Sequence, residues 1–112
     1  MESQRQQKVS KMLQRELGEM FQREGTPKYG GAMITVTKVN VTRDLSLARV
    51  FLSLFATKDK KSLLESIRSH AGEIRFNLGR RIRNQVRHIP DLEFYEDDSL
   101  DYIEKIDELL DK

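Results

Sequence analysis

The sequence predicts a small α+β fold, because stretches with helical periodicity alternate with stretches typical of β-strands. Helical repeats cover residues 3–24 and two segments before Pro90, whereas residues 33–56 are rich in Val, Ile, Thr and Phe. The expected order is α-β-β-α-α-β followed by a C-terminal helix. We expect a three-stranded sheet packed against helices, in a single domain that covers residues 1–112.

The first helix is predicted over residues 3–24, where apolar side chains recur every three or four positions. Glycine and proline favour a loop after it, at Gly25-Thr26-Pro27 and Gly30-Gly31. The apolar stripe of this helix comprises Val9, Met12, Leu13, Leu17, Met20 and Phe21.

Two strands are predicted over residues 33–42 and 47–56, joined by a polar hairpin connection, Thr42-Arg43-Asp44-Leu45-Ser46. In the second strand one face is apolar, and we expect the mixed opposite face to be only partly covered. The apolar face comprises Ala48, Val50, Leu52, Leu54 and Ala56, and the mixed face comprises Leu47, Arg49, Phe51, Ser53 and Phe55.

The next two helices are expected to be joined by a kink at Gly72. Either Asp59 or Ser62 can cap the first of them, which runs to about His70. The second has an apolar stripe that ends before Pro90. A short strand around Leu92 and Phe94 and an acidic last helix, capped by Asp98 or Ser99, complete the chain. The two stripes are Ile74, Leu78, Ile82 and Val86, and then Leu100, Ile103, Ile106 and Leu110.

The composition indicates a soluble globular protein of the cytoplasm. Hydrophobic residues make up 38% of the chain and charged residues 34%, so a core is possible under a densely charged surface. Cysteine is absent, which excludes disulfides, thiolate zinc sites and cysteine nucleophiles and fits a reducing compartment. No apolar run approaches the roughly 20 residues of a membrane span, and the N-terminus lacks a secretory signal.

The charge is distributed very unevenly along the chain. Residues 1–90 hold 18 Lys and Arg against 8 Asp and Glu, a net charge of +10, whereas residues 91–112 hold 2 against 10, a net charge of −8. A basic body attracts polyanions, so nucleic acid or an anionic membrane surface is the expected partner class. The acidic end argues against the membrane surface.

The strongest candidate for a binding site is a set of arginines after Gly72. Arg80, Arg83 and Arg87 lie at relative positions 0, 3 and 7, so on a continuous helix they share one face. No Asp or Glu lies between Ile74 and Pro90, so ion pairs within this helix cannot explain them. We expect these guanidinium groups to bind phosphate oxygens and to stack on exposed bases.

Other basic residues are candidates for the same surface. Arg75 lies near the apolar side and could instead support the kink by hydrogen bonding to backbone carbonyls. The basic residues of the first helix could be a solvated face or phosphate contacts. The flanking candidates are Arg68, Arg75 and Arg81; further candidates are Lys58, Lys60 and Lys61 before the second helix, and Arg5, Lys8, Lys11 and Arg15 in the first.

Nothing in the sequence indicates an enzyme, a metal site or a bound cofactor. The two histidines, His70 and His88, have no partner at metal-ligand spacing, and the motifs of a phosphate loop or a nucleophile elbow are missing. A divalent cation could in principle bind the oxygen ligands of Asp97, Asp98 and Asp101, but capping of the last helix explains them better.

The element order is that of the type II KH domain, a single-stranded RNA module that clamps nucleotides with a Gly-x-x-Gly loop. That loop is missing here, and in detail the chain resembles the ribosome-binding factor A family over nearly its whole length. In that KH-like family an Ala-x-Gly kink replaces the clamp, and it aligns with His70-Ala71-Gly72 here. The resemblance rests on Ile34-Thr35-Val36-Thr37-Lys38-Val39 with Asp44-Leu45, on Gly72-Glu73-Ile74-Arg75, and on Pro90-Asp91-Leu92-Glu93-Phe94 with Asp97 and Ser99.

The resemblance implies a non-enzymatic monomeric factor that binds the free, immature small ribosomal subunit. Such a factor assists late maturation of 16S rRNA, notably during growth in the cold. Two other classes remain open from the residues alone. One is a generic RNA-binding or protein-interaction module that docks through the acidic C-terminal helix, and the other is a DNA-binding protein or nuclease.

Overall fold

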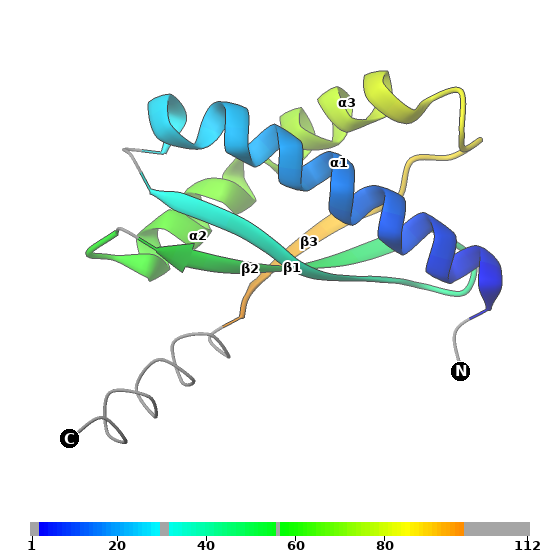
Figure 1. Ribbon diagram of the computed structural model, residues 1–112, viewed down its shortest axis with the longest axis horizontal. Coiled ribbons are helices and arrows are strands. Elements are labelled where there is room, and N and C mark those ends of the chain that lie inside the picture. The colour runs from blue at the N-terminus through cyan, green and yellow to red at the C-terminus, as the bar shows by residue number, and fades with distance from the viewer. Residues whose placement is uncertain (1–2, 30–31, 56, 98–112) are drawn as a thin grey trace.

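The computed structural model describes residues 3–29, 32–55 and 57–97 and has the α+β fold that the sequence predicts. The last predicted helix and its caps, Asp98 and Ser99, lie outside the described residues. Figure 1 shows the elements in chain order: α1 (Gln4–Lys28), β1 (Met33–Val41), β2 (Leu47–Phe55), α2 (Lys60–Ser69), α3 (Ala71–Ile82) and β3 (Asp91–Glu96).

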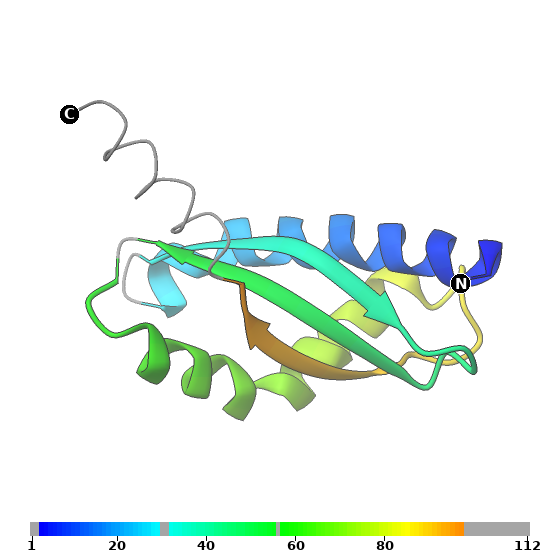
Figure 2. The ribbon, with the colours of Figure 1, turned by 90° about the horizontal axis from the view of Figure 1, so that it is seen from below.

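The three strands form one mixed sheet in the order β1-β2-β3. β1 pairs with β2 antiparallel, as a hairpin, and β3 pairs with β2 in parallel. The register places Val39, Val50 and Phe94 beside one another across the sheet. The helices cover one face of the sheet, and Figure 2 shows the opposite face, seen from below.

The core lies between the sheet and the helices. Side chains from α1, β2 and α3 meet there with no exposed surface. On the other face of β2, Phe51 and Phe55 are only partly covered, as predicted, but Ser53 is buried, so the predicted alternation fails at that position. The fully buried residues include Leu13 and Leu17 of α1, Val50 and Leu52 of β2, and Leu78 and Ile82 of α3.

The first helix is longer than predicted, because α1 continues through Gly25 and Pro27 to Lys28. Both residues weaken an isolated helix, but packing of an amphipathic face supplies most helical stability in proteins. Phe21 and Tyr29 are both buried near this end, and their rings lie 6.3 Å apart. This contact fixes the end of α1 and overrides the local signal for a loop.

Of the two residues predicted to cap the second helix, Asp59 is the one that does so. The Asp59 carboxylate accepts hydrogen bonds from the Ser62 backbone N–H (3.0 Å) and hydroxyl (2.7 Å), so Asp59 is the N-cap. These bonds also hold the pKa of Asp59 below its usual value.

The chain leaves the helical path at His70, which separates α2 from α3. Its Nδ1 lies 2.7 Å from the Ser66 carbonyl oxygen, and its backbone N–H donates to the Ile67 carbonyl, so His70 satisfies carbonyls at the end of α2. Gly72 lies one residue inside α3, so the sequence interpretation that Gly72 interrupts the helix was wrong in position. The two helices are separate, as predicted, but the residue between them is His70 and not Gly72.

The third helix is shorter than predicted, because α3 ends at Ile82 rather than just before Pro90. Residues 83–85 form a turn in which the Gln85 N–H donates to the Ile82 carbonyl at 2.8 Å. The chain must reverse here to place β3 beside β2, where the Asp91 N–H donates to the Ser46 carbonyl at 2.9 Å. Val86 keeps its predicted packing against the core without remaining helical.

Candidate nucleic-acid interface

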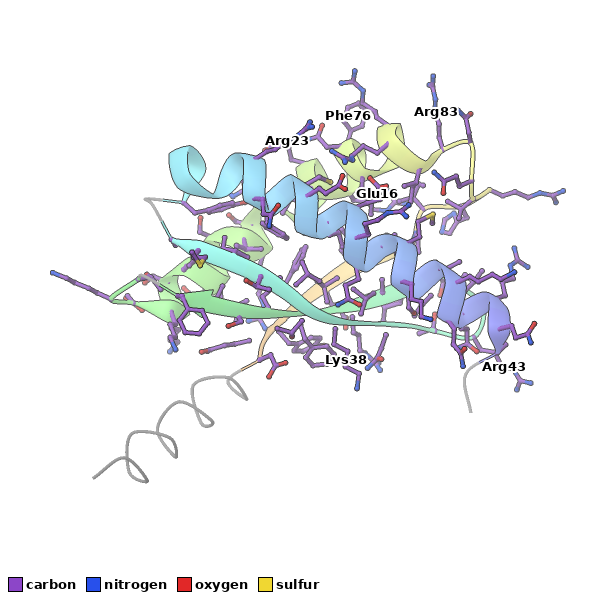
Figure 3. The ribbon with its side chains drawn as sticks, in the orientation of Figure 1. Glu16, Arg23, Lys38, Arg43, Phe76 and Arg83 are labelled. Atoms are coloured by element: carbon purple, nitrogen blue, oxygen red, sulfur yellow. The ribbon has the colours of Figure 1, made fainter. Side chains whose placement is uncertain are left out.

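The outer face of α3 carries two of the three predicted arginines. Arg80 and Arg83 are exposed, and Arg83 keeps helical backbone angles (φ −55°, ψ −26°), so the two side chains project from the same face. Neither forms an ion pair or hydrogen bond within the part of the chain that the structure describes. In Figure 3, Arg83 points away from the sheet. Both guanidinium groups therefore remain available to an external anion.

Arg87 does not lie on that helix face, which corrects the prediction, because α3 ends five residues before it. Its side chain instead lines a cleft of about 520 Å³ between the start of α1, the β1–β2 hairpin and the loop before β3. Figures 1 and 2 both place this loop near the first turns of α1. The cleft is lined by the charged side chains of Arg5, Lys8, Arg43, Asp44 and Arg87, together with His88.

The hairpin turn supplies Arg43, which was not among the binding residues predicted from the sequence. Leu45 adopts a positive φ of 62°, and the Asp44 carboxylate accepts hydrogen bonds from Ser46 and Thr42, which lower the pKa of Asp44. The acid at this cleft is thus bonded within its own turn. Arg43 is exposed beside it and has no ion pair among the described residues. Only the tertiary fold brings Arg43 near Arg87, 44 positions away in sequence.

The basic residues of α1 extend this cleft toward α3. Lys8, Lys11 and Arg15 line an adjoining groove of about 380 Å³ together with Gln85 and Val86 of the loop after α3. Arg15 also lies 3.5 Å from Glu16, with its side chain mostly exposed. We call the combined set the basic surface: Arg5, Lys8, Lys11, Arg15, Arg43, Arg80, Arg83 and Arg87.

Arg81 faces α1 rather than the basic surface. It donates to Glu16 Oε2 at 2.8 Å and forms a second ion pair with Glu19. The hydrogen bond from Arg81 lowers the pKa of Glu16, and the same bond raises the pKa of Arg81. The local absence of acids around Arg81 in the sequence was therefore misleading, because its partners come from another helix.

Two further arginines bind backbone carbonyls. Arg75 donates to the carbonyls of Ile89 (2.7 Å) and Pro90 (3.2 Å), so it supports the loop before β3 and not the α2–α3 junction. Arg68 donates twice to the Phe94 carbonyl, at 3.0 and 2.8 Å, and its guanidinium lies 5.8 Å from the centre of the Tyr95 ring. Both side chains fix β3 against the helices.

The lysines at the start of α2 lie apart from the basic surface. Lys60 is 4.0 Å from Glu96 of β3, and Lys61 is exposed beside it. Figure 1 places this end of α2 opposite the end of the molecule where α1 begins. A ligand would have to span the molecule to contact both regions.

Another groove, of about 710 Å³, lies between α1 and the open edge of β1. The Gln14 side-chain amide donates there to the carbonyls of Val36 (3.4 Å) and Thr37 (3.2 Å), so α1 itself satisfies part of this strand edge. Within residues 3–29, 32–55 and 57–97, no group of three His, Asp or Glu side chains is arranged to hold a metal ion. Asp97 accepts a hydrogen bond from the Thr37 hydroxyl at 2.7 Å, and Asp98 and Asp101 lie outside the described residues.

No helix in the described part of the chain has the length and apolar character needed to cross a membrane.

Comparison with known proteins identifies the family. The family model of ribosome-binding factor A matches residues 5–110. The ribosome-binding factor A of Cytophaga hutchinsonii is 42% identical over 112 residues, which cover 100% of this chain and 84% of that protein. The one of Flavobacterium psychrophilum is 46% identical, over 98% of this chain and 85% of that protein.

Solved structures agree with these sequence matches. The crystal structure of ribosome-binding factor A from Thermus thermophilus has a TM-score of 0.68 at 24% identity and covers 81% of this chain and 94% of its own, which shows the shared fold. A model of the same factor fitted into a cryo-EM map of its 30S complex has a TM-score of 0.64 at 26% identity, over 79% and 90% of the two chains. The chain belongs to the ribosome-binding factor A family.

Proposed function

We propose that this protein binds the free, immature small ribosomal subunit and assists late maturation of its 16S rRNA in the cytoplasm. It acts as a monomeric single domain and catalyses no reaction. Support comes from the family membership, from the 30S complex of the Thermus thermophilus factor, and from the basic surface. The proposed role also includes a greater need for the factor during growth in the cold.

The observation that carries the proposal is the convergence of basic side chains from three separate segments, all of which except Arg15 have no ion-pair partner among the described residues. α1, the hairpin turn and the α3–β3 segment contribute basic side chains to adjoining clefts. Guanidinium groups bind phosphate oxygens with fixed geometry, and each phosphate neutralised releases counterions. A surface of this kind fits a folded rRNA backbone better than it fits a small molecule.

The proposed roles divide the predicted arginines into two groups. Arg80, Arg83 and Arg87 contact rRNA phosphates directly, together with the α1 and hairpin residues of the basic surface. Arg68, Arg75 and Arg81 are positioning residues, because each is bonded to the protein itself. Lys60 and Lys61 make at most a peripheral contact at the other end of the molecule.

The mechanism follows from binding alone. A protein that binds one conformation of rRNA more tightly than another shifts the population toward the favoured conformation, by no more than the difference in binding free energy. Phosphate contacts fix the register of the protein, and the shape of the folded rRNA decides which subunits fit. No covalent step is required.

Co-sedimentation through a sucrose gradient tests the proposal. The protein should migrate with free small subunits, should be absent from assembled ribosomes, and should leave the subunit fraction after nuclease digestion. Equal binding to assembled ribosomes would contradict the preference for free subunits. A complex that survives nuclease would show that a protein partner holds the factor instead.

A further inference from the structure

Phe76 on α3 is a large apolar side chain turned to solvent. It is 66% exposed, and among the described residues only Met33 is a comparably exposed large hydrophobic side chain. Full burial of a Phe side chain is worth roughly 1.5–3 kcal/mol, and Phe76 gains little of this stabilisation in the described structure. Its place on the helix indicates a binding role.

The ring lies at the centre of the exposed face of α3. Leu78, buried with no exposed surface, projects from the opposite side of the helix. Arg80 and Arg83 follow Phe76 at four and seven residues, which is one and two helical turns away on the same face. Figure 3 shows Phe76 and Arg83 both pointing away from the sheet.

The helix leaves open space on one side of Phe76, at Gly72, whereas Ile89 packs against the helix at Gly79. Of the positions three and four residues away, two are glycines, Gly72 and Gly79, and the others are Glu73 and Arg80. A Cβ built at Gly72 would meet nothing within 4 Å, so the surface one turn before Phe76 is open. A planar group could therefore approach the ring, although Glu73 lies on one flank of the same face.

We infer that Phe76 is a stacking platform for one unpaired nucleobase of the RNA that the basic surface binds. This inference rests on the proposed function and names the part of the RNA that α3 contacts. Arg80 and Arg83, one and two turns further along the same face, would hold phosphates on one side of the stacked base. Unpaired bases stack on aromatic rings, whereas the faces of paired bases are covered by their neighbours in the helix.

A nucleobase fits these observations better than the apolar side chain of a partner protein. The two cations beyond the ring on its face have no ion-pair partner among the described residues, and a partner that buried them without acids would have to desolvate both charges. A nucleotide supplies an aromatic face and a negative charge at adjacent positions. The charge complementarity thus selects RNA.

Three variants at this position test the inference: Phe76→Ala, Phe76→Leu and Phe76→Trp. The probes are isolated small subunits, a single-stranded oligoribonucleotide and the duplex form of that oligoribonucleotide. Loss of one base stack is worth about 1–3 kcal/mol, so Phe76→Ala should weaken binding to subunits and to the single strand about 5- to 150-fold. Binding to the duplex should not change.

The other two variants separate stacking from general apolar contact. Phe76→Leu should bind as weakly as Phe76→Ala, whereas Phe76→Trp should bind like the unaltered protein and its indole fluorescence should be quenched by RNA. Because Phe76 is exposed, the variants should keep the thermal midpoint of the unaltered protein.

The outcomes also separate this inference from the proposed function. If Arg83→Gln weakens subunit binding while Phe76→Ala does not, the stacking role is wrong and the basic surface stands. If Phe76→Leu binds as tightly as the unaltered protein, the position needs only an apolar side chain, the ring docks an apolar protein surface, and the inference is overturned. If neither Arg83→Gln nor Phe76→Ala affects binding to subunits, both proposals are wrong.

Discussion

Arg81 of α3 donates a hydrogen bond to Glu16 of α1 at 2.8 Å, across 65 residues of sequence. Figure 3 shows Glu16 on α1 at the side that faces α3. The ion pair joins the two helices that carry most of the basic surface. Since Arg80 and Arg83 lie one and two residues from Arg81 on the helix, the pair also fixes the direction in which they project.

The substitution Glu16→Gln should lower the free energy of unfolding near neutral pH by about 1–2 kcal/mol, because it removes the carboxylate charge at Glu16 and leaves Arg81 paired with Glu19 alone. The Glu16 side chain is only 14% exposed and that of Arg81 28% exposed, so solvent screens this pair less than a surface pair. Urea denaturation at neutral pH measures the effect.

The pH dependence gives this prediction its control. The pKa of Glu16 is lowered in the folded protein from its ordinary value of 4.5, so the stabilisation is complete above pH 4.5 and is lost as the pH falls through the folded pKa. The difference between the variant and the unaltered protein should therefore shrink in acid. A difference that is equally large at about pH 3 would assign the effect to packing and not to charge.

Asp59→Ala should destabilise the protein, because the carboxylate caps the first turn of α2. Ser62→Ala is the matched control, since it removes the hydroxyl contact but keeps the backbone N–H that Asp59 caps. Thermal unfolding should show the larger loss for Asp59→Ala. Equal losses would mean that the hydroxyl contact, and not the backbone cap, stabilises the helix.

Gly72→Ala should be tolerated and should raise the free energy of unfolding by up to about 0.5 kcal/mol, because alanine is the better helix former and a Cβ here meets open space. At Gly79 a Cβ would lie 3.3 Å from Cγ1 of Ile89, so Gly79→Ala should be less stable than Gly72→Ala. Denaturant unfolding compares the two variants. A loss of stability in Gly72→Ala would mean that the α2–α3 junction needs this glycine.

Arg43→Gln should weaken binding to isolated small subunits several-fold if the hairpin turn contributes to the basic surface. Lys38→Gln removes the same charge from the face of the sheet opposite α1, α2 and α3, and Figure 3 shows Lys38 on the side opposite Phe76 and Arg83. This control should bind normally in the same filter-binding assay. Equal losses in both variants would indicate a nonspecific effect of net charge.

The sequence predicted the elements whose periodicity is strong and whose boundaries are set locally. Both hairpin strands, the cap candidate Asp59 and the apolar stripe of α3 through Ile82 were confirmed. It misplaced boundaries that depend on tertiary contacts. α1 continues past Gly25 because Phe21 and Tyr29 pack at its end, and α3 stops early because β3 must start beside Ser46.

The candidate site was only partly predictable for the same reason. Exposure of Arg80 and Arg83 follows from one helical repeat, whereas the bonding of Arg81 to α1 depends on which helices pack together. The approach of Arg43 to Arg87 depends on the parallel placement of β3, and nothing in the local sequence of the hairpin turn indicates it. The signal in the sequence that pointed to this cleft was the series of basic residues in the N-terminal half of α1.

The salt dependence of binding to isolated small subunits tests the central claim, which is that the outer face of α3 contacts rRNA phosphates. The slope of log affinity against log salt concentration should fall by about 1 for each lost contact, and therefore by about 2 in a variant that combines Arg80→Gln with Arg83→Gln. Lys38→Gln should leave the slope unchanged. A double variant with the affinity and slope of the unaltered protein would contradict the account.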